Sequence, residues 1–328
     1  MRSSALMLFA AACSLAQQPQ VENAKLETRA FAGTIASQIS QSGAGPFWIA
    51  WSEPIIPGRR GEMCWSNGNN DTEHSAGAPV RLEGQVALVV LARIENSQVD
   101  QLRVVSPDCR LDAGGLPLVW LNNVPAQESV NWLKAQISGK HPDTAIFSIG
   151  LHSGADADQA LDELSSPSQP ERVREKTAFW LGTSRGVHGV EMLKRMLAAE
   201  PSQKVREQVV FALAQSREPA GMAAVIDAAK SDRDSKVRAK ALFWLAQKAA
   251  GKQAQDVIGN AVVNDPDRSV KEQAVFALKQ LPEDQGVPLL INVAKTNPDP
   301  AVRKKAIFWL GQSKDPRALD YFAQILKP

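Results

Sequence analysis

The chain has 328 residues, and its 37 lysines and arginines nearly balance 35 aspartates and glutamates, which leaves a formal net charge of +2. The basic residues are not concentrated into runs, so the charge pattern argues against nucleic acid as the main partner. Beyond residue 16, no apolar stretch approaches the length needed to span a bilayer, and we expect no transmembrane segment in the mature chain.

Residues 1–16 have the features of a targeting segment. Arg2 precedes an apolar run, and Ser14 and Ala16 place small residues at −3 and −1 before Gln17. This pattern predicts a secretory signal peptide that is cleaved after Ala16. The alternative is a lipobox ending at Cys13, which would leave that cysteine acylated. We favour simple cleavage, because alanine stands where such motifs usually carry leucine, and we expect a periplasmic or secreted protein.

Removal of residues 1–16 leaves two cysteines, Cys64 and Cys109. An even pair in an exported chain predicts a disulfide, and loss of such a bridge typically costs about 2–5 kcal/mol in a small secreted domain. The signal peptide and the cysteine pair therefore agree on an oxidising, extracytoplasmic compartment.

Residues 17–125 predict a small α+β or mainly β domain that the disulfide staples. The spacing of Leu26, Phe31, Ile35 and Ile39 predicts a helix, and residues 59–78 predict a long loop. Alternating or continuous apolar runs predict strands over residues 47–51, 85–94, 101–106 and 116–121. The second and third of these strands are expected to form a hairpin that turns at residues 96–97.

From residue 173 onward, a charged lead-in followed by an apolar block recurs down the chain. Its phenylalanines step by 32, 32, 33 and 32 residues, and one further step back reaches Phe147 in a degraded copy; they are Phe179, Phe211, Phe243, Phe276 and Phe308. A fixed period of this size is typical of a solenoid, in which each unit buries its apolar face against its neighbours.

Each period holds two amphipathic helices separated by turns rich in Pro, Asp and Ser, such as residues 265–267. The pattern predicts an α-solenoid of about six helix pairs over residues 126–328. A last helical stripe is expected to cover the final repeat as a cap; it consists of Ala318, Leu319, Phe322, Ile325 and Leu326.

The combination of Asp-Pro-Asp, two variable residues, Val-Arg/Lys, an apolar block and Leu-Gly/Ala resembles the second half of a HEAT repeat, most closely the short bacterial form. The resemblance covers roughly residue 127 to the C-terminus. It implies an array of paired helices whose inner surface binds other macromolecules, usually proteins, and usually without catalysis.

Two positions of the repeat alternate in step. Lysine stands one helical turn before tryptophan in every second copy; the pairs are Lys176 with Trp180, Lys240 with Trp244 and Lys305 with Trp309. One interpretation is packing, in which each tryptophan fits beside a neighbour's alanine and the lysine stem covers the indole. The other is a row of Lys–Trp pairs that grips a partner by cation–π and stacking contacts. We favour packing, since tryptophan shares the core-facing side of the helix.

A second column is basic in every copy and consists of Arg174, Arg206, Arg238, Lys271 and Arg303. In resembling repeats this residue forms a ladder with acidic turn residues, for which Asp234, Asp267 and Asp299 are the candidates here. The alternative is a basic stripe that faces a partner. We favour the intramolecular ladder.

The search for catalytic or metal-binding motifs gives none. The four histidines are scattered, and no His-Glu pair repeats through the helices, so we expect no metal, no cofactor and no catalysis. Glu62, Glu73 and His74, near Cys64, form the one local cluster suited to acid–base chemistry, and a polar loop is the favoured interpretation.

Our leading hypothesis is a non-enzymatic, exported scaffold that binds a protein or peptide on its inner helices, through the Lys–Trp pairs and the basic column. The first alternative is a glycan or small-ligand module that uses Trp48, Trp51 and Trp65 of the N-terminal domain. The second alternative is an enzyme whose site lies in that domain.

Overall fold

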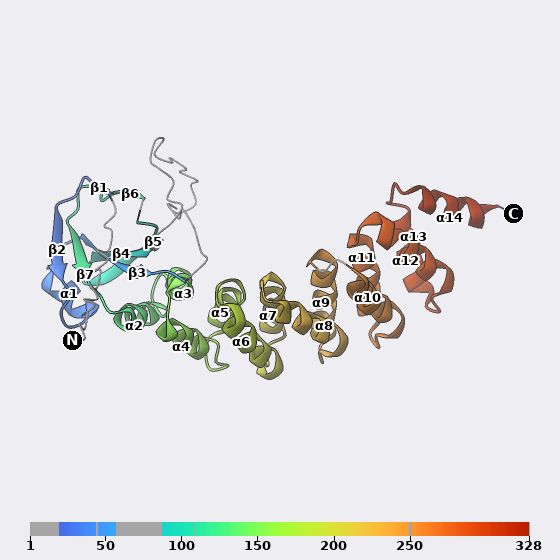
Figure 1. The fold of residues 1–328 in the computed structure, drawn as a ribbon, viewed down its shortest axis with the longest axis horizontal. Helices are drawn as coiled ribbons and strands as arrows, with labels where there is room; N and C mark the ends of the chain where they lie inside the picture. Colours follow the sequence, from blue (N-terminus) through green and yellow to red (C-terminus); the bar gives the residue numbers. More distant parts are fainter. Residues whose placement is uncertain (1–19, 44, 57–86, 108, 249–250, 328) are drawn as a thin grey trace, which may run out of the picture. The chain divides into compact units, whose positions relative to one another are not determined.

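The computed structural model describes residues 20–43, 45–56, 87–107, 109–248 and 251–327 (Figure 1). The chain divides into two compact units, residues 1–157 and 158–328, which are described separately below. The N-terminal domain expected from the repeat pattern ends at residue 125, whereas the division by packing falls at residue 157. Within the described residues, no helix is long and apolar enough to cross a membrane.

The first unit combines a sheet with three helices. Its elements in chain order are β1 (Gln20–Glu22), β2 (Leu26–Ala30), α1 (Ile35–Gln41), β3 (Phe47–Pro54), β4 (Ala87–Glu95), β5 (Gln98–Val105), β6 (Arg110–Asp112), β7 (Leu118–Asn122), α2 (Ala126–Gln136) and α3 (Pro142–Leu151). Within the described residues, the larger sheet has the order β2-β7-β3-β4-β5, and β1 pairs with β6 separately. β7 lies parallel to β2 and β3, whereas β3, β4 and β5 run antiparallel.

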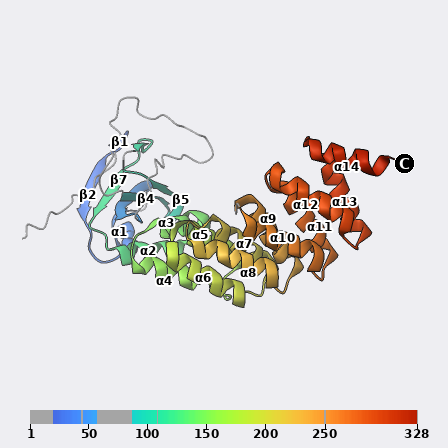
Figure 2. The same cartoon turned by 45° about the vertical axis from the view of Figure 1, so that its right-hand side comes forward.

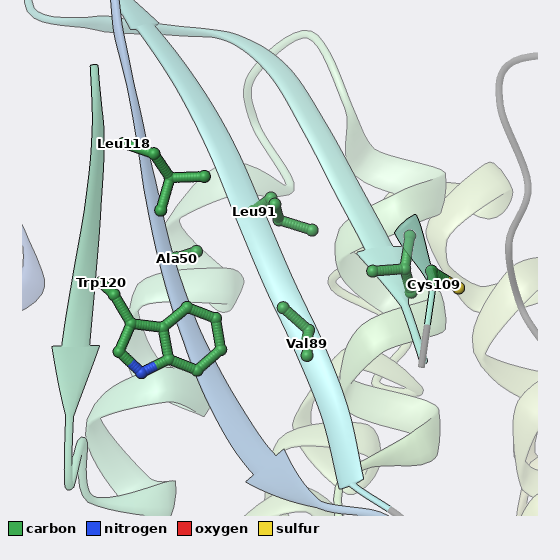
Figure 3. Close-up of a cluster of buried hydrophobic side chains, with 7 residues drawn as sticks. Ala50, Val89, Leu91, Cys109, Leu118 and Trp120 are labelled. Carbon is green, nitrogen blue, oxygen red and sulfur yellow. The ribbon is translucent and has the colours of Figure 1, made fainter. Parts of the chain in front are cut away.

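The central strands β3, β4 and β7 of this sheet are buried on both faces, whereas the edge strand β2 is mostly exposed. One face carries the cluster shown in Figure 3, with residues of β1 and β6 packed against it; the cluster consists of Ala50, Val89, Leu91, Val105, Cys109, Leu118 and Trp120. On the opposite face of β3, Trp51 meets helix α2, where its indole lies edge-on to Trp132 with ring centroids 5.2 Å apart. This two-sided burial explains why β3, β4 and β7 read as continuous apolar runs.

The structure corrects one element and confirms others. Residues 26–30 form strand β2 rather than the first turns of a helix, because they pair along their whole length with β7. The helix begins at Ile35, where Thr34 accepts from the backbone N–H of Ser37 in a capping box. The expected hairpin is confirmed, with φ angles of 51° and 60° at Asn96 and Ser97, in the left-handed region that a tight hairpin turn requires.

The second unit is a succession of helices: α4 (Ala155–Leu164, which crosses the division), α5 (Glu171–Ser184), α6 (Gly186–Ala199), α7 (Gln203–Gln215), α8 (Pro219–Ser231), α9 (Ser235–Lys248), α10 (Lys252–Asn264), α11 (Arg268–Gln280), α12 (Glu283–Thr296), α13 (Pro300–Leu310) and α14 (Pro316–Leu326). The odd-numbered helices α5 to α13 carry the recurrent phrase and pack side by side (Figures 1 and 2). We call them the inner row and α6, α8, α10 and α12 the outer row. The predicted solenoid of helix pairs is confirmed here, while the pair α2 and α3 that carries Phe147 packs within the first unit.

Glycines allow the two rows to approach closely. A Cβ added at Gly189, Gly221 or Gly286 of the outer row would lie 2.0, 2.6 or 2.4 Å from the carbonyl oxygen of Leu181, Leu213 or Leu278. Each of these leucines closes the apolar block of the preceding inner helix. These glycines therefore determine how closely α6, α8 and α12 pack against the inner helix before each of them.

The last helix differs from the expected cap. Only Ala318 and Tyr321 of α14 are buried, whereas Leu319, Ile325 and Leu326 are 65%, 50% and 79% exposed. The expected stripe therefore identified the helix but not the face that packs. Tyr321 is buried, and Lys295 of α12 lies 5.6 Å from its ring centroid.

Candidate functional site

The inner row carries a continuous line of aromatic rings. The phenylalanines of successive helices stack in pairs, with centroids 6.1 Å apart for Phe179 and Phe211 and 6.5 Å apart for Phe243 and Phe276. Each pair is joined to the next helix by a tryptophan. We call this line the aromatic ladder, and it consists of Trp180, Phe179, Phe211, Trp244, Phe243, Phe276, Trp309 and Phe308.

The ladder explains the alternation of tryptophan with alanine. Trp244 lies 4.9 Å from Phe211 of the preceding helix and 5.0 Å from Phe243 of its own helix. Trp309 repeats this arrangement with Phe276 at 5.2 Å and Phe308 at 4.9 Å. In α7 and α11 the residue that corresponds to tryptophan is Ala212 or Ala277. There the phenylalanine stacks directly on that of the preceding helix. The tryptophans therefore act as spacers within the packed row, as the packing interpretation requires.

The ladder nevertheless reaches the surface. Its rings are half-buried up to α11, and Phe308 of α13 is 54% exposed. Half-buried aromatic rings in a row offer a large contact area at little cost in side-chain entropy, which is why aromatic residues dominate binding surfaces. The ladder is therefore the part of the second unit best suited to contact a partner.

The predicted lysines lie on the ladder helices and differ in exposure. Lys176 is exposed, and Lys240 and Lys305 are half-buried. Lys279 lies over a ladder tryptophan, with its Nζ 6.0 Å from the Trp309 centroid. Within the described residues, neither Lys240 nor Lys305 forms an ion pair, so both charges remain available to another molecule.

Two ladder tryptophans carry a polar group without a partner. The Nε1 atoms of Trp244 and Trp309 are buried, and within the described part of the chain neither donates a hydrogen bond. A buried unsatisfied N–H typically costs about 1–3 kcal/mol. The indoles are therefore held in place by ring packing rather than by hydrogen bonds.

The arginines of the basic column are occupied within the protein. Arg174 donates from Nε and Nη2 to Glu200 at 2.8 Å each, and Arg238 does the same to Asp265 at 2.8 Å. Arg206 reaches Asp232 at 2.9 Å. These arginine and acid side chains are at most 10% exposed. The hydrogen bonds to Glu200 and Asp265 raise the pKa of the Arg174 and Arg238 guanidinium groups.

The acids of this ion-pair ladder are not those expected from the sequence. Asp267 and Asp299 act as helix N-caps and accept from the backbone N–H groups of Ser269 and Ala301. Both carboxyls have a lowered pKa, chiefly through hydrogen bonds with Ser269 and with the Ala301 backbone. The acids that bind arginine instead end the outer helix that follows each arginine's own helix, as the C-caps of α6, α8 and α10. Their carboxylates also accept from a backbone N–H two residues later.

The last two members of the column differ. Lys271 is half-buried, and the position corresponding to the acids is Asn297, whose Nδ2 donates to the Val262 carbonyl at 3.3 Å. Arg303 donates to the backbone carbonyls of Asn297 and Pro298. The ion-pair ladder therefore stops after Asp265.

Two features of the inner row were missed by the sequence reasoning. The phenylalanines were used to measure the period but not proposed as a surface, although their fixed position in every copy was a usable signal. One turn after the phenylalanine in the last four copies stands a side-chain amide, and these form a column; they are Gln215, Gln247, Gln280 and Gln312. Gln247 donates to Gln280 at 3.3 Å.

The first unit contains a buried hydrogen-bonded chain. Trp51 Nε1 donates to Ser129 Oγ at 2.8 Å, this oxygen lies 2.8 Å from His152 Nε2, and His152 Nδ1 lies 2.7 Å from the Ser148 carbonyl oxygen. Because a carbonyl only accepts, Nδ1 carries the proton and Nε2 accepts from the serine. The side chains of Trp51, Ser129 and His152 are fully buried, so these hydrogen bonds hold α2 and the end of α3 against β3. Trp51 is therefore not a surface residue that could bind a ligand.

The other residues predicted to act in this unit differ in exposure, and several lie outside the described residues. Trp48 is half-buried, with the Arg103 guanidinium 5.9 Å from its centroid. Cys109 is 1% exposed in the sheet cluster. Its predicted disulfide partner and the candidate loop residues lie outside the described residues, so these predictions stay untested; they concern Cys64, Glu62, Trp65, Glu73 and His74.

The first unit also has a hollow of about 430 Å³ between α1, the β4–β5 hairpin and α2. Trp132, Gln136, Lys140 and His141 are among its lining residues. Its lining combines aromatic, amide and cationic groups. Within the described residues, no group of three or more His, Cys, Asp or Glu side chains is placed to hold a metal ion.

The geometry of the second unit defines a class: an α-solenoid of stacked helix pairs with an aromatic inner row. The HEAT-repeat family matches residues 157–246 and 256–328, which supports a HEAT-like solenoid in this part of the chain. No curated protein matches the chain.

Two solved structures are similar in part. Human deoxyhypusine hydroxylase in complex with glycerol is 15% identical, with 62% of this chain and 91% of that chain covered and a TM-score of 0.29. The complex of CpcE and CpcF of phycocyanin lyase from Nostoc sp. PCC7120 is 20% identical, with 56% and 98% covered and a TM-score of 0.30. Similarities with TM-scores this low give no information on the function of this protein.

Proposed function

We propose that this protein is a non-enzymatic scaffold that binds a protein or peptide partner along its inner row. The observation that carries the proposal is the aromatic ladder, which runs without interruption from α5 to α13 and remains half-exposed. The neighbouring amides and lysines add hydrogen-bonding groups and charge. HEAT repeats generally mediate protein interactions, which supports the same function.

The basic column has a different role in this proposal. Arg174, Arg206 and Arg238 are consumed by buried ion pairs, so they stiffen the stack rather than contact the partner. Because these ion pairs are buried, the aromatic ladder and the lysines beside it are the groups that face the partner. The proposed binding site is therefore the exposed side of the inner row.

Affinity capture from a native extract tests this proposal. The bait is the full chain, compared with a Phe243→Ala/Phe308→Ala variant that removes two ladder rings. The matched control is Val187→Ala/Val263→Ala, because these valines are 66% and 49% exposed on outer helices. We expect a discrete protein to be retained by the wild type and the control and lost from the ladder variant. Equal retention by all three would contradict the proposal.

A small-ligand or glycan function in the first unit is the second candidate, and the hollow beside Trp132 is the observation that favours it. Titration with an oligosaccharide panel, followed by tryptophan fluorescence and compared with a Lys140→Ala/His141→Ala variant, tests it. A saturable change that the variant abolishes would favour this function over the scaffold.

We also propose that the protein is exported, cleaved after Ala16 and oxidised at Cys64 and Cys109. The apolar N-terminal run and the cysteine pair support this. Peptide mapping under non-reducing conditions should find an N-terminus at Gln17 and a cross-linked Cys64–Cys109 peptide. Retained Met1 with two free thiols would contradict it.

A further inference from the structure

We propose that the partner segment is an acidic peptide bound in an extended conformation across α9, α11 and α13. This inference rests on the proposed function and adds the chemical class of the partner. Its basis is the distribution of charge over the inner row, together with the spacing and orientation of the groups that border the ladder.

The charge of the inner row changes along its length. The helices α9, α11 and α13 contain ten basic residues and one acidic residue, Glu272. In contrast, α5 and α7 mix both signs, and there Lys204 Nζ pairs with Glu175 at 2.8 Å. The last three inner helices therefore present a positive field to a partner, which favours negative charge on that partner.

Not all of these cations are available. Arg238 is buried with Asp265, Arg268 pairs with Asp299 at 2.9 Å, and Arg303 donates to backbone carbonyls. Of the other seven, Lys240 and Lys305 lie one turn before Trp244 and Trp309 on the ladder side of their helices, without an ion pair among the described residues. Lys279 lies beside them over Trp309. A few cations beside an apolar surface fit a peptide segment that carries only a few carboxylates.

The spacing of the two lysines sets the spacing of those carboxylates. Adjacent packed helices lie about 8–10 Å apart, so Lys240 and Lys305, two inner helices apart, are separated by roughly 16–20 Å. An extended chain advances about 3.1–3.4 Å per residue. Two acidic residues about five or six positions apart would therefore meet the two lysines, with the residues between them on Phe243, Phe276 and Phe308.

The ladder favours a peptide over a single-stranded nucleic acid. Bases bind by stacking on open aromatic faces. Here the phenylalanines stack in pairs, as Phe243 and Phe276 do with an interplanar angle of 4°, and the tryptophans lie edge-on or tilted against them. The surface thus consists largely of ring edges and side-chain amides, which suit aliphatic side chains and a peptide backbone. A phosphate on every nucleotide would also exceed the three lysines that border the ladder, Lys240, Lys279 and Lys305.

Selection of a phage-displayed library of random 16-residue peptides on the full chain tests this inference, followed by fluorescence anisotropy of the selected peptides. We expect enrichment of Asp and Glu five or six positions apart. We also expect at least a tenfold loss of affinity in Lys240→Glu/Lys305→Glu, and weaker binding as the salt concentration rises. The matched control is Lys230→Glu/Lys252→Glu on the outer helices α8 and α10, which changes the net charge equally and should bind as the wild type does.

The outcomes separate this inference from the function on which it rests. Neutral or basic peptides whose binding is lost in Phe243→Ala/Phe308→Ala would overturn the acidic partner class and leave the proposed function standing. Failure to select any peptide that depends on these phenylalanines would overturn both. Tighter binding of an oligothymidine than of every selected peptide would identify a nucleic-acid surface and overturn the inference.

Discussion

Arg238 and Lys271 occupy the same position of successive inner helices, yet their surroundings differ. Arg238 meets Asp265 in a bidentate, buried ion pair, whereas the residue that corresponds to Asp265 one repeat later is Asn297. The oxygen of Asn297 still accepts from the backbone N–H of Asp299 at 3.0 Å, as Asp265 accepts from Asp267 at 2.9 Å. The turn is thus preserved while the ion pair is absent.

Restoring the pair should stabilise the second unit in a cooperative manner. Asn297→Asp alone should lower the free energy of unfolding, because it places a carboxylate without an arginine in a buried position. The double variant Lys271→Arg/Asn297→Asp should exceed the sum of the single effects by about 1–3 kcal/mol. Urea denaturation of the four proteins of this cycle measures the coupling. Additive single effects would show that the side chains do not meet.

Among the described acids of the first unit, Glu53 has the most strongly perturbed pKa. It is 2% exposed on β3, its Oε1 has no hydrogen-bond partner among the described residues, and burial raises its pKa to about 8. The folded state therefore keeps the carboxyl protonated at pH values where the unfolded chain, with a pKa near 4.5, has released the proton. Below pH 4.5 both states are protonated, and no penalty exists.

The stability of the first unit should consequently fall as the pH rises from about 4.5 to about 8 and level off above it, by an amount on the order of a few kcal/mol. Glu53→Gln should remove this dependence, since the amide does not titrate. Hydrogen exchange of the β3 and β4 amides across this pH range, corrected for intrinsic exchange, is the measurement. A wild-type profile as flat as that of the variant would show that Glu53 is not protonated in the folded protein.

At the scale of elements, the outer glycines set the distance between the two rows. Gly221→Ala should destabilise the second unit by about 1–3 kcal/mol, because the new methyl would lie 2.6 Å from the Leu213 carbonyl oxygen and force α8 away from α7. Gly259→Ala in α10 is the matched control. A Cβ at Gly259 meets nothing within 4 Å, so this change should stabilise the helix by about 1 kcal/mol.

Thermal denaturation followed by circular dichroism at 222 nm compares these two glycine variants. The expected result is a lower melting temperature for Gly221→Ala and an equal or higher one for Gly259→Ala. If the melting temperatures of both variants shifted in the same direction, helix propensity rather than packing between the rows would determine the effect. The close approach to the Leu213 carbonyl oxygen would then not affect stability.

The sequence predicted the repeated elements better than the single ones. The 32-residue period identified the helix pairs because the same packing problem is solved in every copy, and five copies average out local exceptions. Strand β2 was missed because Leu26 was grouped with Phe31, Ile35 and Ile39, whose four-residue spacing is helical. The pairing of residues 26–30 with distant β7 determines their conformation, and it is not visible in the local sequence. Non-local pairing overrides local spacing here.

The candidate site was predicted in part for the same reason. The Lys–Trp alternation was visible, and so was the arginine column, because both recur with the period. The acids that bind those arginines were misplaced by two residues, since each turn holds several carboxylates and only the three-dimensional turn decides which one caps a helix and which one faces the preceding inner helix. The ring-to-ring contacts of the ladder likewise follow from stacking of successive helices.

At the scale of the whole molecule, the chain consists of two compact units with different kinds of cooperativity. The sheet of the first unit joins strands far apart in sequence, such as β2 and β7. In the second unit each helix pair contacts its neighbours, so stability is a sum of repeat terms and interface terms. A local perturbation should therefore remain within one unit, and within the second unit it should fade with distance along the repeats.

Hydrogen exchange on the full chain at pH 8 tests this difference with two variants. Glu53→Gln should increase protection in β3 and β4 and leave α9 and α11 unchanged. Arg238→Ala should leave Asp265 buried without its partner, which typically costs about 3–5 kcal/mol. It should reduce protection most in α9, less in α7 and α11, and least in α5 and α13, with no change in the sheet. An equal loss of protection in both units would show that the chain unfolds as one cooperative body, and an equal loss across all inner helices would show that the repeats are not coupled only to their neighbours.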